Sequence, residues 1–143
     1  MKLEAFVPKG KKIDERWKKV TVLQCLNHTG GWDRGKSYDP IGRPWDIAQA
    51  LRIKTPVSPS NVVRYMMGQP LDFDPGERDA YSNLGYLVLG RLIESVSGQS
   101  YVDYVKTKVL APLKVKAPRL GKALVANRAK NEVLYYDSMK REG

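Results

Sequence analysis

The stretch DPGERDAYSNLGY, residues 74–86, is the most informative part of this 143-residue sequence. The Pro75-Gly76 pair predicts a tight turn, since proline presets one turn position and glycine tolerates the next. Beyond the stretch, a helix ending at Gly98 is predicted from apolar residues that recur every three or four positions. These residues are Leu84, Leu87, Val88, Leu92 and Ile93. The turn therefore delivers the triplet 81–83 to the start of the strongest predicted helix.

The triplet Tyr81-Ser82-Asn83 has residue types suited to chemistry at that position. A helix start gathers unpaired N–H groups and the positive end of the helix dipole, which favours anions. A phenolate there is a plausible general base where cations flank it, and a carboxamide can both donate to and accept from a substrate amide. On the residues alone a simpler interpretation also stands: Ser82 or Asn83 caps the helix, and Tyr81 is a half-buried aromatic residue.

Further helices are predicted on both sides of this stretch. Thr21 can cap a short helix through Leu26, and Ser58-Pro59 is a typical helix start for a helix that Gly68 ends. Ser100 opens another helix, with Tyr101, Tyr104, Val105 and Val109 on its expected inner face, and Pro112 ends it.

The segment 32–56 is expected to be a long ordered loop with a helical turn near 46–51, packed by Trp32, Tyr38 and Trp45. The sequence thus predicts a mainly α chain in three parts. These are a basic irregular lead-in (1–16), a partial helical domain (17–118) and a basic tail (119–143) with a short strand at 132–136.

The net charge of +10 is concentrated at the two ends of the chain. Residues 1–19 carry seven basic and three acidic side chains, 20–104 carry eight and nine, and 105–143 carry ten and three. No aromatic residues interleave with the basic ones, and no nucleic-acid motif is present, so a specific nucleic-acid partner is not expected. No apolar run approaches the roughly 20 residues that a membrane span needs.

Three segments together resemble the group of class C β-lactamases, D-alanyl-D-alanine carboxypeptidases and family VIII esterases. VTVLQCLNHTGG (20–31) resembles that group's T-V-x-x-L-L-x-H-T-S-G segment, and DPGERDAYSN (74–83) resembles its P-G-x-x-x-x-Y-S-N element. LGRLIESVSGQSY (89–101) followed by LAPL (110–113) resembles the next two helices. The order and spacing of the three matches make the resemblance specific.

The resemblance implies a fold and roles for the matched residues. The fold would be the helical subdomain of an α+β β-lactamase/transpeptidase-like structure, with the antiparallel sheet and the nucleophile helix largely missing. Tyr81 would be the general base that activates a serine nucleophile, and Asn83 would hold the substrate's amide or ester group. Ser82, Gly76 and His28 would be structural, the His28 ring holding the turn from Thr29 to Trp32. No cofactor and no metal are implied.

The nucleophile motif of that group, Ser-x-x-Lys, does not occur in the sequence. None of its serines has a lysine three residues later: Ser37, Ser58, Ser60, Ser82, Ser95, Ser97, Ser100 and Ser138. The late Lys-Thr-Gly strand of that group is also missing. The segment 106–108 (KTK) is no substitute, because it falls in a predicted helix. Without the serine and the lysine no acyl-enzyme can form, so these residues alone are expected to be catalytically incompetent.

Other candidate sites in the sequence are weaker. His28 has no second cluster of ligands at metal-binding spacing, and the four acids between 72 and 79 lack the spacing of a calcium loop. A triad of Ser37, Asp39 and His28 lacks a nucleophile elbow. Cys25 is expected to be a small core residue on the apolar face of its helix.

Three functions remain open on the sequence. The chain is a truncated serine hydrolase, a non-catalytic remnant that acts as an interaction module, or a small basic binding protein. The full-length family would act on a small ester or amide or a peptidoglycan-type substrate, and exposed apolar faces at 84–96 and 101–109 favour self-association or a complementing chain. Pro8 and Lys9 interrupt any signal segment, so the sequence as given would be cytoplasmic. A periplasmic or extracellular full-length parent stays open.

Overall fold

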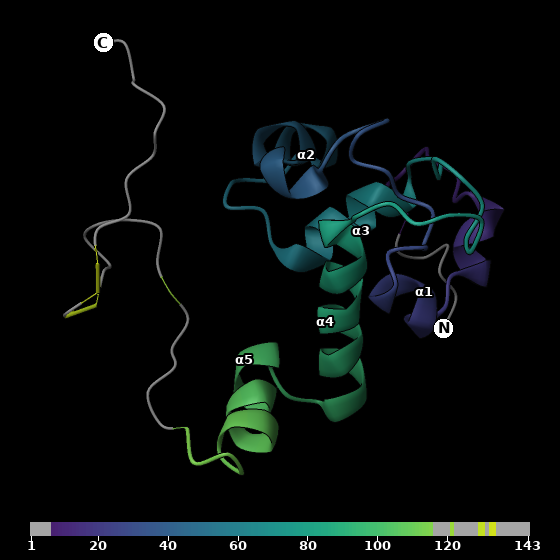
Figure 1. The fold of residues 1–143 in the computed structure, drawn as a ribbon. Coiled ribbons are helices and arrows are strands. Elements are labelled where there is room, and N and C mark those ends of the chain that lie inside the picture. The colour runs from purple at the N-terminus through teal and green to yellow at the C-terminus, as the bar shows by residue number, and fades with distance from the viewer. Residues whose placement is uncertain (1–6, 116–120, 122–128, 131, 134–143) are drawn as a thin grey trace. The chain divides into compact units, whose positions relative to one another are not determined.

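The computed structural model describes residues 7–115, 121, 129–130 and 132–133. These residues form helices and loops, without a β-strand among them, which confirms the predicted mainly α character (Figure 1). The α-helices are α1 (Val22–Leu26), α2 (Pro44–Leu51), α3 (Pro59–Met67), α4 (Asn83–Ser97) and α5 (Tyr101–Tyr104). Two 3₁₀ helices cover Glu15–Lys19 and Pro40–Gly42, and a π-helical segment covers Val105–Leu110.

Local capping explains where the helices begin and end. Thr21 caps α1 through a reciprocal pair with Gln24, in which Thr21 Oγ1 accepts from the Gln24 amide and Gln24 Oε1 accepts from the Thr21 amide. Ser58 caps α3 ahead of Pro59, as its sequence predicts. Gly98 ends α4 in the left-handed conformation at φ 69°, which glycine adopts without strain.

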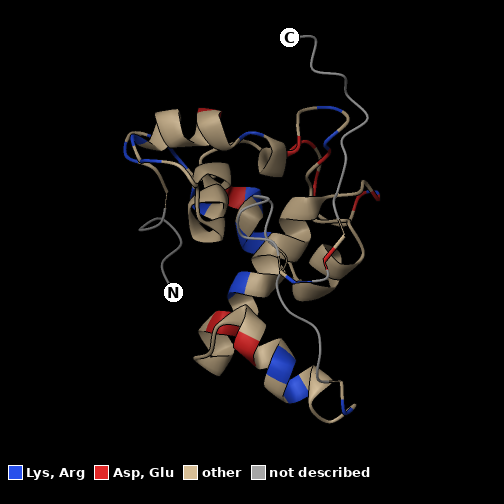
Figure 2. Ribbon diagram, turned by 90° about the vertical axis from the view of Figure 1, so that its left-hand side faces the viewer, with Lys and Arg blue, Asp and Glu red and all other residues tan. Residues whose placement is uncertain are grey.

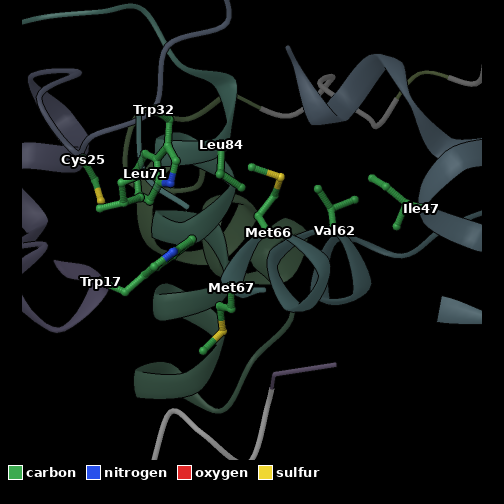
Figure 3. Close-up of a cluster of buried hydrophobic side chains, with 9 residues drawn as sticks. All are labelled: Trp17, Cys25, Trp32, Ile47, Val62, Met66, Met67, Leu71 and Leu84. Carbon is green, nitrogen blue, oxygen red and sulfur yellow. The ribbon is translucent and has the colours of Figure 1, made fainter. Parts of the chain in front are cut away.

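The core is made by nine buried residues from the loops and helices of the first 84 residues (Figure 3). They are Trp17, Cys25, Trp32, Ile47, Val62, Met66, Met67, Leu71 and Leu84. The rings of Trp17 and Trp32 lie 5.0 Å apart. Helix α4 packs against α1 and α3, and α3 packs against α2. This packing fixes the start of α4, where the candidate site lies.

The segment 32–56 is more helical than expected, and one of its aromatic residues lies elsewhere than predicted. Trp32 is buried and Tyr38 packs against the core, but the side chain of Trp45 is 74% exposed. Trp45 is the second residue of α2, whose inward face carries Ile47 and Ala48 instead. The expected packing by Trp45 was therefore wrong.

The end of the predicted lead-in is tied to the loop before α4. Asp14 Oδ2 accepts from the Leu71 amide at 3.0 Å, and Arg16 donates to the Leu71 carbonyl at 2.8 Å and to Asp74 Oδ1 at 2.9 Å. The bond from Arg16 holds the pKa of Asp14 well below its usual range. Hydrogen bonding thus joins residues 14–16 to the helical unit, although they precede the predicted domain.

The chain contacts divide into two compact units, Met1–Tyr101 and Val102–Gly143. In the second unit, Val105–Leu110 contains Lys106-Thr107-Lys108, which is helical as expected. None of the described residues of that unit is buried: on the predicted inner face, Tyr104 and Val105 are half-buried and Val109 is exposed. The predicted boundary at 118 and most of the predicted strand at 132–136 lie outside the described residues.

No helix among the described residues is both long and apolar enough to cross a lipid bilayer. Basic and acidic residues are both spread over the helices and loops of residues 7–101 (Figure 2).

Candidate active site at the start of helix α4

Ser82 caps the helix that carries the candidate site. Its backbone is extended (φ −140°, ψ 117°), and its hydroxyl oxygen accepts from the Gly85 amide at 3.4 Å. The residue is only 6% exposed. The hydroxyl is therefore engaged in a structural bond, and it leaves Tyr81 and Asn83 on either side of the cap.

The phenol of Tyr81 is accessible and directed at its neighbour on the helix. Tyr81 is 52% exposed, and its hydroxyl donates to Asn83 Oδ1 at 3.0 Å. The guanidinium carbon of Arg34 lies 4.5 Å from the centre of the Tyr81 ring. A cation thus lies over the ring face, where the electron-rich π system attracts it.

Asn83 is held on its other side by an acidic residue from the long loop. Its Nδ2 donates to Asp39 Oδ2 at 2.6 Å. A carboxamide has two donor hydrogens and two acceptor lone pairs. The bonds to Tyr81 and Asp39 use one of each, so the carboxamide keeps the capacity for one further donated and one further accepted hydrogen bond.

His28 supports the triplet at the start of α4. Its Nδ1 accepts from the Ser82 amide at 3.3 Å, and its carbonyl accepts from the Ala80 amide at 2.9 Å. Its ring centre lies 4.7 Å from that of Tyr81 and 5.2 Å from that of Tyr86. The ring therefore contacts Tyr81 and Ser82, and the backbone carbonyl holds Ala80; the expected role of the ring in holding the turn from Thr29 to Trp32 stays a prediction. The partner is 54 positions away in the sequence, which local pattern could not reveal.

Gly76 occupies a position that requires glycine. Its φ is 91°, its amide donates to the Thr29 carbonyl at 2.8 Å, and an added Cβ would lie 3.1 Å from Gln24 Nε2. The turn is closed by the Glu77 amide, which donates to the Asp74 carbonyl at 2.9 Å. The turn therefore brings the segment before α4 against Gln24 of α1 and Thr29 just after it.

The alternative sites do not assemble among the described residues. Ser37 Oγ donates to Asp72 Oδ2 at 3.0 Å, whereas Asp39 binds Asn83 and His28 binds Ser82, so the three members of the conceivable triad have different partners. In the part of the chain that the structure describes, no three His, Cys, Asp or Glu side chains gather as metal ligands.

Cys25 is a core residue, as predicted. It is 3% exposed, and burial raises the pKa of its thiol to about 11. The neutral thiol that results at pH 7 is a poor nucleophile.

Sequence reasoning missed the contacts of Arg34 and Asp39 with the site. The motif Asp39-Pro40 does signal a cap, and Asp39 Oδ1 accepts from the Ile41 amide at 3.0 Å at the start of the 3₁₀ helix. Nothing local signals that the second carboxylate oxygen binds a residue 44 positions later.

Comparison with known proteins places the chain in a family. The Beta-lactamase family model matches residues 2–140. The chain is 35% identical over 103 residues to "Penicillin-binding protein 4*" of Bacillus subtilis, covering 71% of this chain and 21% of that protein. It is 42% identical over 98 residues to "Protein flp" of Staphylococcus aureus, covering 68% of this chain and 18% of that protein.

Solved structures agree with this placement. The octameric penicillin-binding protein homologue from Pyrococcus abyssi matches at 35% identity and a TM-score of 0.50, over 66% of this chain and 21% of that one. A D-stereospecific amidohydrolase from Streptomyces matches at 31% identity and a TM-score of 0.53, over 78% of this chain and 32% of that one. The chain thus spans 18–32% of the length of these four proteins. It belongs to the β-lactamase family of serine hydrolases and matches these members over part of their length.

Proposed function

We propose that Tyr81 and Asn83 are the proton-transfer and substrate-binding half of a serine hydrolase site. The whole site would cleave an ester, a β-lactam or a D-Ala peptide through an acyl-enzyme. The observation that carries this proposal is the accessible Tyr81 hydroxyl, 3.0 Å from Asn83 Oδ1 at the start of α4. The names of the relatives, a penicillin-binding protein and a D-stereospecific amidohydrolase, support an amide or peptidoglycan-type substrate.

The proposed chemistry is a proton shuttle. A serine hydroxyl adds to the substrate carbonyl and passes its proton to the phenolate oxygen of Tyr81. The phenol then donates that proton to the leaving nitrogen or oxygen, which leaves the acyl group on the serine for hydrolysis by water. The observed bond, in which Tyr81 donates, corresponds to the protonated phenol of the second step. The free hydrogen of Asn83 Nδ2 would bind the substrate carbonyl.

These 143 residues would not turn over substrate by themselves. The sequence contains neither Ser-x-x-Lys nor Lys-Thr-Gly: Lys54-Thr55 is followed by Pro56, and Lys106-Thr107 lies in the helical segment Val105–Leu110. Tyr81 would therefore need a nucleophile and an oxyanion hole from residues outside this stretch. We expect no hydrolysis of nitrocefin or p-nitrophenyl butyrate by the purified chain. Turnover that Tyr81→Phe abolishes would contradict this expectation.

A non-catalytic interaction module is the second candidate function. The observation in its favour is the exposed apolar surface of α1, where Val22 is 51% exposed and Leu23 is 64% exposed. Such a surface fits association with a second copy or with a complementing chain. A small basic binding protein is less well supported, because the excess positive charge lies outside residues 20–104.

The decisive experiment restores the missing parts from a relative. The segment matching this chain in the Bacillus subtilis penicillin-binding protein would be replaced by residues 20–113, and hydrolysis would be measured with an ester and a D-Ala peptide. We expect activity in the chimera and a fall in kcat of roughly 10²–10⁴-fold with Tyr81→Phe, the usual range for loss of a general acid-base.

Tyr86→Phe is the matched control for this chimera. Tyr86 lies in the first turns of α4, close to Tyr81 in the sequence, and is also 52% exposed, but its hydroxyl donates to the Leu26 carbonyl at 3.2 Å. We expect kcat to change little in this variant. Equal losses in the two variants would show that Tyr81 contributes only to folding, and would refute the proposed role.

A further inference from the structure

Asp39 makes a contact with the candidate site that no role described above explains. It lies in the loop before α2, and its Oδ2 accepts from Asn83 Nδ2 at 2.6 Å. This distance is short, as expected for a hydrogen bond to a charged acceptor. The contact is partly buried, so water competes with it less than at an open surface.

Asp39 is held in place by a hydrogen bond to its carboxylate and by the anchoring of its loop. Its other oxygen, Oδ1, accepts from the Ile41 amide at 3.0 Å and so caps the 3₁₀ helix. The loop that carries it is anchored to Asp72, whose Oδ2 accepts from the Asp33 amide at 2.8 Å and from Ser37 Oγ at 3.0 Å. Asp39 is therefore a fixed acceptor against which Asn83 must adjust.

A carboxylate can only accept hydrogen bonds, whereas a carboxamide has one donating and one accepting side. With the NH₂ side of Asn83 facing Asp39, its oxygen must face Tyr81, and Tyr81 must donate. A rotated carboxamide would place its oxygen against the Asp39 carboxylate, where two acceptors repel each other. The charge on Asp39 thus decides the direction of both hydrogen bonds.

We propose that Asp39 is a positioning residue that fixes the orientation of the Asn83 carboxamide and thereby holds Tyr81 as a hydrogen-bond donor. The relevance of this orientation to hydrolysis rests on the function proposed for Tyr81 and Asn83. Asp39 itself would not touch the substrate. It determines which edge of Asn83, with one free hydrogen and one free lone pair, is offered to the substrate amide.

Nuclear Overhauser contacts in the labelled 143-residue chain test this proposal without any turnover. In the unmodified chain the Asn83 Hδ2 protons should show contacts to the β protons of Asp39 and none to the ring Hε protons of Tyr81. The opposite pattern would refute the proposal, since orientation of the carboxamide is observed directly.

Asp39→Asn is the sharpest variant because asparagine caps helices about as well as aspartate. Its oxygen would keep the bond to the Ile41 amide, and its NH₂ group would then face Asn83. Two facing donors repel each other, so the Asn83 carboxamide should rotate and its Hδ2 contacts should move to the Tyr81 ring. An unchanged pattern in this variant would overturn the inference.

Asp39→Ser provides a second variant, which keeps a capping hydroxyl but is too short to reach Asn83. The contacts of Asn83 Hδ2 with residue 39 should be lost, while the backbone amide chemical shifts remain those of the folded chain. Persistence of one fixed carboxamide orientation in this variant would also contradict the proposal. Asp46→Asn is the control, because Asp46 pairs with Arg43 and is not bonded to Asn83. It should leave the pattern unchanged.

The two proposals fail in different ways. Hδ2 contacts that follow the prediction, together with an inactive chimera, would leave Asp39 as the orienting residue and remove the catalytic role of the pair. An active chimera, together with Asn83 Hδ2 contacts that do not change in the Asp39 variants, would support the proposed function and refute only this inference.

Discussion

The two halves of helix α4 differ in their surroundings. Near its start, Leu84 is fully buried and Gly85 lies against the backbone of α1. Near its end, Leu92 is 41% exposed and Val96 is 80% exposed. The candidate site lies at the packed half, where the core can fix side-chain positions to the accuracy that a hydrogen-bonded site needs.

Among the described residues of their unit, the apolar side chains of Leu92 and Val96 in the second half of α4 stay exposed to water. An apolar helix face gains stability only when it is removed from water. The matched stretch is only 18–32% of the length of the relatives, so such proteins have further residues that could cover these side chains. The first half of α4 is thus stabilised by burial within the described residues, whereas the second half gains little from burial there.

The largest expected effect comes from truncating one apolar side chain in each half. Leu84→Ala should lower the free energy of unfolding by about 2–5 kcal/mol, because it leaves a cavity in the core. Val96→Ala should change it by less than about 0.5 kcal/mol, as is usual at exposed positions. Urea denaturation followed by circular dichroism measures both. Equal losses would show that the second half is also covered in solution, for example by self-association.

Alanine substitutions of two glycines on α4 should change the stability in opposite directions. Gly85→Ala should destabilise by about 1–3 kcal/mol, since its Cβ would lie 3.1 Å from the Cys25 carbonyl oxygen. Gly90→Ala should stabilise by up to about 1 kcal/mol, since alanine favours the helix and the nearest atom, Tyr101 Cδ2, is 3.9 Å away. Thermal unfolding of the two variants gives the comparison. Stabilisation by both substitutions would mean that α1 and α4 are farther apart than described.

The smallest effect concerns stability at low pH, through Asp14 and its bond to Leu71 in the loop before α4. Because the pKa of Asp14 is held low by Arg16, its charged form stabilises the fold above its unfolded pKa of about 4. This contribution, of the order of 1 kcal/mol, is lost as the pH falls through the lower pKa of the folded state. Asp14→Asn should therefore flatten the decrease in stability below pH 4. An unchanged slope would mean that the bonds to Leu71 and Arg16 do not persist in solution.

Several elements could be predicted because their signals are local. A capping residue and the helix it starts lie within four positions of each other, so Thr21, Ser58 and Gly98 could be recognised from their neighbours. The apolar period of residues 84–93 likewise predicted α4. The role of Ser82 as a cap was one of two readings that the residues left open, and the structure decided between them.

The sequence by itself therefore determined the family, helices α1, α3 and α4, and the residue types of the candidate site, because each depends on motifs or on spacing along the chain. Only the tertiary structure decided that His28 binds Ser82, that Trp45 is exposed and that Asp39 binds Asn83. The His28 and Asp39 contacts join residues 54 and 44 positions apart. Their geometry depends on how α1, the long loop and α4 pack around one core, which no local pattern encodes.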